Sequence, residues 1–168
     1  KTTVGCHALK YGGYLIGIDI DRGMEPIAQI FQHDGAVFSM EASRERGFNP
    51  FVLCRGPEDL EFFHHLKQLI VLMLHSNETP AMQVCTAEEQ HALDEAMVAT
   101  ARLANPALHR LRTVVLHCPQ SLQTKLHRWV HADGQAGMYA RFFDAEEDAI
   151  GSIDRRVTAF NLKAIKDN

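Results

Sequence analysis

Short apolar runs alternate with a helical pattern in the first part of this chain. Residues 14–18 form a nearly continuous apolar run that ends in Asp19, which is typical of a strand covered on both faces in a parallel sheet. Residues 24–32 predict a helix, because Pro26 would lie in its first turn, where the missing N–H costs nothing. Residues 36–40 predict a second short strand. This succession of strand, helix and strand indicates an α/β unit.

The middle of the chain carries helical patterns instead. Residues 57–75 predict a helix whose apolar side chains lie near one face. Thr86 and Glu89 form a capping box, in which the Thr86 hydroxyl accepts the Glu89 N–H and the Glu89 carboxylate reaches back. The helix that they open is predicted to run to about Leu103.

The last part of the chain returns to β structure. Two shorter helices are predicted first, around residues 108–117 and 121–131, although residues 113–116 could equally form a strand by propensity. Residues 156–160 then predict a third strand. The order of these elements predicts an α/β domain with a helical insertion.

Length and composition fit one globular domain with a sizeable core. The chain has 168 residues, of which 46% are hydrophobic and 23% charged. Its net charge of −4 argues against a dedicated nucleic-acid binder, which would show a basic patch. Residues 69–74, the longest apolar stretch, are far fewer than the roughly 20 residues of a membrane-spanning helix. The four cysteines are too widely spaced for a zinc site and predict buried thiols in a reducing cytoplasm.

Lys1, Thr2 and Thr3 could be the last residues of a phosphate-binding loop. In such a loop the lysine neutralises the β- and γ-phosphates, and the following Ser or Thr ligates Mg²⁺. The glycines of the loop would precede Lys1, so a chance Lys-Thr-Thr at the start of the chain is the alternative. Because the chain begins with Lys1 rather than Met, we expect it to be a fragment.

Asp19 and Asp21 flank the end of the first predicted strand. Ligands of open α/β sheets bind beyond the carboxyl ends of the strands, so either carboxylate could orient a metal-bound water or a partner arginine. The alternative is that the aspartate only ends the strand or caps the next helix. The sequence leaves both interpretations open.

Ten histidines raise a metal site as a further hypothesis. His127 and His131 would lie on one face of a helix, but no Glu stands between them to act as a zincin-type base. We therefore expect surface or core-edge histidines. The acidic run at residues 144–148 lacks the ligand spacing of a calcium loop and is expected to be a solvated turn.

Four stretches, in this order, resemble one protein family: the TrbE/CagE/VirB-type ATPases that energise conjugation and type IV secretion. Residues 1–3 fall where the family's Walker A motif ends, and residues 18–23 resemble its strand-ending FDKDRG signature. Residues 47–51 resemble its GFNP loop, and residues 134–148 are similar to the G…G…LDAEED segment of the TrbE branch. The stretch from Lys1 to the first strand is shorter than in the family by about one helical turn.

The resemblance implies a RecA-like P-loop NTPase core, with a partial parallel sheet and an all-helical insertion. Residues 1–56 would begin the core, residues 57–133 would form the insertion, and residues 134–168 would return to the core. The chain would open inside the phosphate-binding loop and stop before the Walker B strand, so its catalytic acid is unknown. Because phosphoryl transfer needs several such parts at once, we expect the isolated chain to hydrolyse no ATP at a useful rate.

The cofactors that the resemblance implies are ATP and Mg²⁺. Lys1 would contact the β- and γ-phosphates, Thr2 would ligate Mg²⁺, and Thr3 would lie near the α-phosphate. These roles hold only if Lys1 is the Walker A lysine.

Further residues take their roles from the same resemblance. Asp19, Asp21 and Arg22 would lie at the carboxyl edge of the sheet, near the nucleotide or a subunit boundary. Asn49 and Pro50 would shape a loop rather than do chemistry.

The family resemblance also implies an assembly and a location. The parent protein would be a homo-oligomer, a hexamer, at the cytoplasmic face of a bacterial inner membrane beside other type IV secretion components. No direct sequence-specific nucleic-acid binding is expected. The alternative function is a non-catalytic interaction module that uses the helical block to bind a partner.

Overall fold

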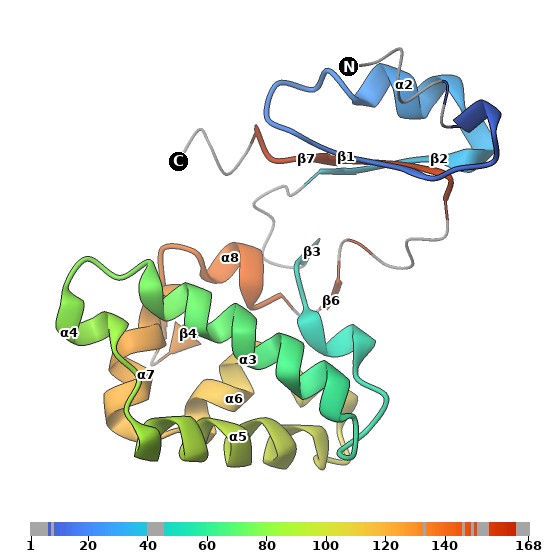
Figure 1. The fold of residues 1–168 in the computed structure, drawn as a ribbon. Helices are drawn as coiled ribbons and strands as arrows, with labels where there is room; N and C mark the ends of the chain where they lie inside the picture. The colour runs from blue at the N-terminus through green and yellow to red at the C-terminus, as the bar shows by residue number, and fades with distance from the viewer. Residues whose placement is uncertain are drawn as a thin grey trace. The chain divides into compact units, whose positions relative to one another are not determined.

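The computed structural model describes residues 7, 9–39, 46–132, 134–145, 147–148, 150 and 155–163. The chain forms two compact units: unit 1 comprises Lys1–Ala42 and Ala149–Asn168, and unit 2 comprises Ser43–Asp148 (Figure 1). Unit 2 is thus inserted into the chain of unit 1. The predicted helical block, residues 57–133, falls within unit 2.

Unit 1 contains a parallel sheet of three strands in the order β1 (Leu15–Asp19), β7 (Val157–Asn161) and β2 (Gly35–Ser39). Helix α2 (Glu25–Ile30) and the 3₁₀ turn η1 (Gln32–Asp34) connect β1 to β2. The predicted parallel sheet, its three strands and the helix that begins near Pro26 are confirmed, with ends shifted by one or two residues.

Helix α2 packs closely on one face of this sheet. A Cβ at Gly35 would lie 1.8 Å from the carbonyl oxygen of Ala28, so only glycine fits at the start of β2. Ala28 and Ile27 are buried together with Val157 and Ala159 in a small apolar core. The close approach of the Ala28 carbonyl to the backbone of Gly35 therefore sets the distance between α2 and the sheet.

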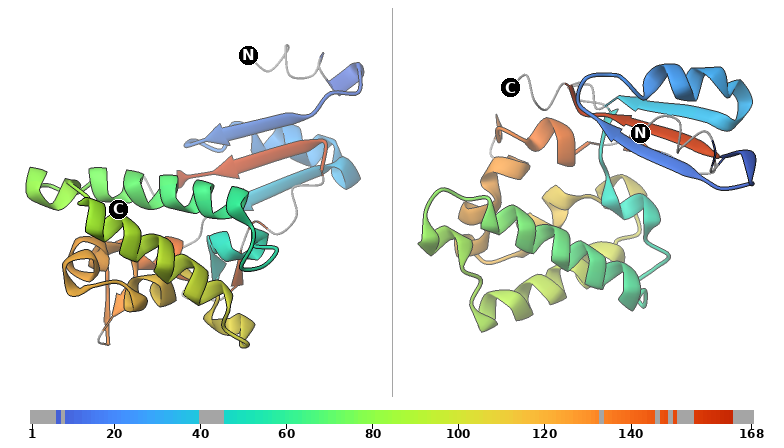
Figure 2. Two further views of the ribbon diagram at one scale, coloured as in Figure 1. Left: turned by 60° about the horizontal axis from the view of Figure 1, so that its bottom comes forward. Right: turned by 45° about the horizontal axis from the view of Figure 1, so that its top comes forward.

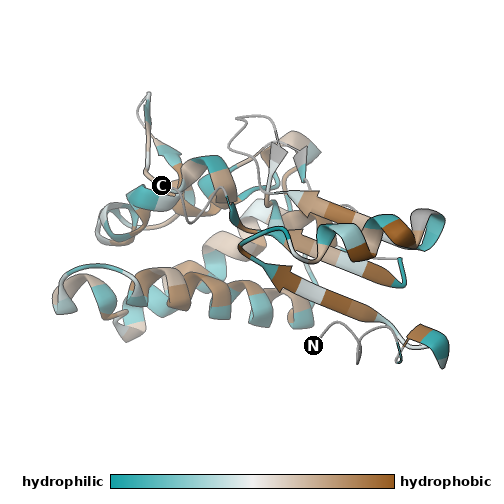
Figure 3. Ribbon diagram, turned by 90° about the horizontal axis from the view of Figure 1, so that it is seen from above, coloured by the Kyte–Doolittle hydropathy of each residue, from teal (hydrophilic) through white to brown (hydrophobic). Residues whose placement is uncertain are grey.

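The opposite face of β1 is open to solvent among the described residues. Ile16 and Ile18 are 59% and 71% exposed, although apolar residues run along all three strands (Figure 3). The prediction of a strand covered on both faces is therefore wrong for β1, because among the described elements α2 covers one face and the face with Ile16 and Ile18 stays exposed. Val157 and Ala159 of the central strand β7 are buried instead.

Unit 2 is mainly helical (Figures 1 and 2). Its helices are α3 (Leu60–His75), α4 (Pro80–Gln83), α5 (Ala87–Ala101), α6 (Leu111–His117), α7 (Gln120–Leu126) and α8 (Ala140–Phe143). Its 3₁₀ turns are η2 (Pro50–Leu53), η3 (Pro106–Leu108) and η4 (His127–Trp129). Strand β3 (Arg46–Gly47) pairs in parallel with β6 (Glu147–Asp148), and β4 (His131–Ala132) pairs antiparallel with β5 (Gln135–Ala136).

Local signals set the beginnings of the two long helices. Asp59 caps α3 by accepting the Phe62 N–H at 3.2 Å. The predicted capping box of Thr86 and Glu89 opens α5 with both of its hydrogen bonds. In the described part of the chain, no helix combines the length and apolar character needed to cross a membrane.

The shorter helices depended on tertiary packing. Residues 113–116 belong to α6 and not to a strand, since Val114 and Val115 are buried in the core of unit 2. The helix predicted for residues 121–131 is too long. Helix α7 ends at Leu126, η4 follows, and His131 begins β4.

Candidate functional site

The carboxyl edge of the sheet in unit 1 collects polar residues from all three strands. Asp19, Asn161 and Ser39 occupy matching register positions at the ends of β1, β7 and β2. Open α/β sheets bind ligands at this edge. It is therefore the candidate functional site.

Asp19 is held by the turn that follows β1. Its Oδ1 accepts the Asp21 N–H at 3.0 Å, and its Oδ2 accepts the Met24 N–H at 2.8 Å. These donors, first that of Asp21 and then that of Met24, lower the pKa of the Asp19 carboxyl. Asp19 thus caps the turn into α2. Because a carboxylate has about four acceptor positions, it can also accept a hydrogen bond from a metal-bound water.

Glu25 links this turn to the central strand. Its Oε1 lies 3.7 Å from Arg22 Nε and also accepts a hydrogen bond from the Asn161 amide. Asn161 is buried, with 4% of its surface exposed. Arg22 adopts a left-handed φ of 62°, and residues in such sparsely populated conformations cluster at ligand and switch sites.

Three of the predicted site residues, Asp19, Asp21 and Arg22, lie in one turn at this edge. They supply carboxylate oxygens, which Mg²⁺ prefers, and a guanidinium that can pair with phosphate. Lys1, Thr2 and Thr3 lie outside the described residues.

Asn161 and Glu25 were not predicted. Asn161 directly follows the predicted strand at residues 156–160, just as Asp19 ends the first strand. This position could have predicted Asn161 as a site residue, because the carboxyl ends of parallel strands meet at the same edge of a sheet. No local sequence pattern marked Glu25 as a site residue, since its partner Asn161 lies 136 residues away in sequence.

Two of the motifs behind the family resemblance interlock in unit 2. The Phe48 N–H donates to the Phe142 carbonyl at 2.6 Å, and the Phe48 ring meets the Phe143 ring edge-on with centroids 6.1 Å apart. The Asn49 N–H donates to Asp148 Oδ1 at 2.9 Å. Together with the pairing of β3 and β6, these contacts hold the two ends of unit 2 side by side.

Asn49 shapes its loop, as the resemblance implied. Its Oδ1 accepts the Phe51 N–H at 3.1 Å and caps η2, in which Pro50 is the first residue. Its Nδ2 donates to the His109 carbonyl at 3.1 Å. The Val52 N–H donates to the Asn49 carbonyl at 3.3 Å, so all four polar groups of Asn49 are used within the fold.

Asp144 is fully buried in unit 2, with 0% of its side chain exposed. Its Oδ2 accepts from Arg112 Nε at 2.9 Å and from the His131 N–H at 2.8 Å, and it lies 3.0 Å from His131 Nδ1. The expectation of a solvated turn is therefore wrong at this residue, because its neighbours Phe142 and Ala145 are buried too. The carboxylate ties α6, β4 and the end of α8 together.

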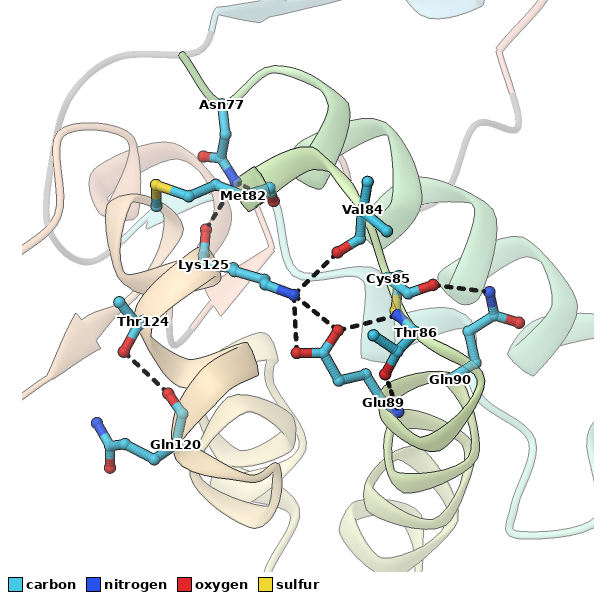
Figure 4. Close-up of polar contacts among 10 residues, drawn as sticks. All are labelled: Asn77, Met82, Val84, Cys85, Thr86, Glu89, Gln90, Gln120, Thr124 and Lys125. Atoms are coloured by element: carbon cyan, nitrogen blue, oxygen red, sulfur yellow. Dashed lines mark hydrogen bonds and ion pairs between the residues drawn. The ribbon is translucent and has the colours of Figure 1, made fainter. Parts of the chain in front are cut away.

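A second nearly buried ion pair joins α7 to α5 (Figure 4). Lys125 Nζ lies 2.7 Å from both carboxylate oxygens of Glu89 and 2.9 Å from the Val84 carbonyl, so all three of its N–H groups are used. Burial raises the pKa of Glu89, but the hydrogen bonds from Lys125 and Thr86 outweigh it and leave this pKa below its ordinary value. The pair is structural, since the capping box engages the same carboxylate.

The described histidines do not form a metal site. Among the described residues, no group of three or more His, Cys, Asp or Glu side chains is placed to hold a metal ion. His127 and His131 do not share a helix face, because α7 ends before both. The His127 ring contacts the Thr124 carbonyl at 2.7 Å, and the His131 ring contacts Asp144.

Unit 2 also contains a groove between η2 and the first half of α3, which we call the α3 groove. It has a volume of about 540 Å³. Its apolar lining residues are Phe48, Pro50, Leu53, Phe62, Leu66 and Leu69. A second hollow of about 550 Å³, the acidic hollow, is lined by residues 55–61 and shares three charged residues with the groove: Arg55, Asp59 and Glu61.

The chain shares its fold with VirB4 of Thermoanaerobacter pseudethanolicus. The two structures match with a TM-score of 0.66 and 16% sequence identity, over 99% of this chain and 47% of that chain. This chain thus spans about half the length of that protein. No protein-family model matches the sequence, and no curated protein matches it. The predicted resemblance to VirB-type proteins is confirmed by this likeness of fold.

Proposed function

We propose that this chain is part of an ATP-hydrolysing motor that energises conjugation or type IV secretion, including pilus assembly and substrate translocation. The observation that carries the proposal is a parallel sheet, interrupted by a helical unit, whose carboxyl edge presents Asp19, Asp21 and Arg22. The sequence motifs and the VirB4-like fold support the same assignment. The sheet would belong to a RecA-like P-loop core, with residues 57–133 as its helical insertion.

In this proposal ATP and Mg²⁺ bind at the carboxyl edge of the sheet. Lys1 contacts the β- and γ-phosphates, Thr2 ligates Mg²⁺, and Thr3 lies near the α-phosphate. Asp19 and Asp21 orient metal-bound water, and Arg22 pairs with phosphate or with a neighbouring subunit. The catalytic acid comes from a Walker B strand in the parent protein.

The proposed assembly follows the same family. The parent protein forms a hexamer at the cytoplasmic face of a bacterial inner membrane, where it contacts other secretion components. It makes no sequence-specific contact with nucleic acid, in line with the net charge of −4 of this chain.

The decisive experiment is ATP hydrolysis by the full-length parent protein. Lys1→Ala is expected to lower kcat by at least about 100-fold, because the lysine stabilises charge on the transferred phosphoryl group. Lys10→Ala, at an exposed lysine of unit 1, is the matched control and is expected to keep its activity. Equal hydrolysis by both variants would refute the proposal.

The isolated chain of 168 residues supplies a second test. In this proposal the Walker B strand belongs to the rest of the parent protein, so we expect no ATP turnover above background from the isolated chain. Turnover that depends on Lys1 would contradict this expectation.

The alternative function is a non-catalytic interaction module that binds a partner through the helical block. The α3 groove favours this possibility, because it is an apolar hollow on the surface of unit 2. Activity of the parent protein that is indifferent to Lys1→Ala would favour this alternative.

A further inference from the structure

We propose that the α3 groove and the acidic hollow together bind an amphipathic helix of a partner protein, one that presents large apolar side chains followed by a Lys/Arg cluster. This surface lies wholly within unit 2, so the inference stands independently of nucleotide binding. This occupant is favoured by the apolar lining of the groove, by the charges beside it and by the helical elements that form both hollows.

The groove offers apolar area that folding leaves uncovered. Its floor is made by the buried side chains of Phe62 and Leu66. At its margin Leu53 is 67% exposed, and in the acidic hollow Leu60 is 79% exposed. Covering such area gains about 25 cal/mol per Å². An occupant therefore needs large apolar side chains.

The charges beside the groove favour a basic occupant. The acidic hollow carries Glu58, Asp59 and Glu61 against the single cation Arg55. Arg55 is already engaged: its Nε lies 2.9 Å from Asp59 Oδ2, and its Nη2 lies 3.1 Å from Glu61 Oε2. The Glu61 side chain is nevertheless 74% exposed. A Lys/Arg cluster would meet this excess of carboxylate, whereas an acidic segment or a nucleic acid would be repelled.

The form of the surface favours a helix over other occupants. The two hollows share Arg55, Asp59 and Glu61, so one occupant can reach both, with an apolar part in the groove and a basic part at the acidic hollow. A small molecule would fill only one of them. A peptide that binds by strand addition would need an open strand edge to pair with, and the lining elements are helical.

The test is fluorescence polarisation with a fluorescein-labelled peptide of about 14 residues, roughly four helical turns. The probe carries Leu at helix-face spacing and Lys at its basic end, and a matched peptide carries Glu in place of Lys. The full chain is expected to bind the Lys peptide saturably, and at least about tenfold more tightly than the Glu peptide.

Two variants with equal added charge locate the binding site. Leu53→Asp, in the groove, is expected to weaken binding of the Lys peptide by about tenfold or more. Leu72→Asp changes a residue of nearly equal exposure, 66%, that lines neither hollow, and is expected to leave binding within about twofold. Non-specific attraction would strengthen with either variant, so only groove binding predicts that Leu53→Asp weakens binding while Leu72→Asp leaves it unchanged.

Amide chemical shifts of the ¹⁵N-labelled chain give an independent readout. Addition of the Lys peptide is expected to shift amides of residues 48–69 selectively. The inference is overturned by an absence of saturable binding, by equal effects of Leu53→Asp and Leu72→Asp, or by shifts confined to other parts of unit 2. An intact shift pattern in both variants excludes unfolding as the cause of any loss.

Discussion

The two units of this chain differ in where their polar side chains lie. In unit 2 the charged side chains Asp144, Glu89 and Lys125 are buried or nearly so, and each is held by several partners. In unit 1 the polar residues gather instead at the edge of a small sheet, beside the exposed Ile16 and Ile18. Buried polar contacts therefore help to hold unit 2 together, whereas unit 1 presents polar and apolar surface that is available for further contacts.

The two units also differ in the size of their buried apolar cores. Unit 2 buries a large cluster around α3, α5, α6 and α7, whereas the cluster of unit 1 contains five buried residues in the part of the chain that the structure describes. A larger buried apolar area gives a larger stability. We therefore expect unit 2 to unfold at higher denaturant concentration than unit 1.

The largest effect is expected from Asp144→Ala in unit 2. Removing this carboxylate leaves Arg112 and the His131 N–H without their partner, which should cost about 3–5 kcal/mol of unfolding free energy. Urea unfolding can be followed by the fluorescence of Trp129, the only tryptophan of the chain, which is 9% exposed in the core of unit 2.

The matched control for this change is Asp94→Ala. Asp94 also pairs with a cation, at 2.7 Å from Lys67, but its side chain is 49% exposed. Its loss should cost less than about 1 kcal/mol. Equal destabilisation by both variants would show that the buried contacts of Asp144 stabilise unit 2 no more than an exposed ion pair does.

A smaller effect, confined to unit 1, is expected from Gly35→Ala. The new Cβ would meet the Ala28 carbonyl at 1.8 Å and push α2 off the sheet, at a cost of about 3 kcal/mol. Hydrogen exchange of the β2 and β7 amides should accelerate, while the Trp129 transition keeps its midpoint. A shift of that midpoint would mean that the two units unfold as one.

Apart from the Asp94→Ala control, the smallest effect is expected from Glu89→Gln, and it should depend on pH. At neutral pH the change should cost about 1–2 kcal/mol, because Lys125 loses its charged acceptor. The folded state lowers the pKa of Glu89, so its contribution is full above the ordinary value of 4.5 and disappears as the pH falls through the lowered pKa. Unfolding curves of both forms should converge in acid. A difference that persists there would show that packing, not charge, stabilises this position.

The polar edge of unit 1 follows in part from sequence. The apolar run before Asp19 predicted a strand, and the general placement of ligands at strand ends pointed to Asp19 and Asp21. Arg22 was added by the family resemblance. The sequence could not reveal that Asn161 binds Glu25, because that contact depends on β7 pairing with β1 across the whole length of unit 2.

Patterns of short range were sufficient for the strands, for the capping box of α5 and for the helical character of the middle of the chain. These features depend on residues a few positions apart, so the sequence alone determined them. Tertiary structure decided the rest: the burial of Asp144, the end of α7 before His131 and the exposure of Ile16. Each of these depends on which distant segment of the chain packs against the residue, and composition and local spacing do not identify that segment.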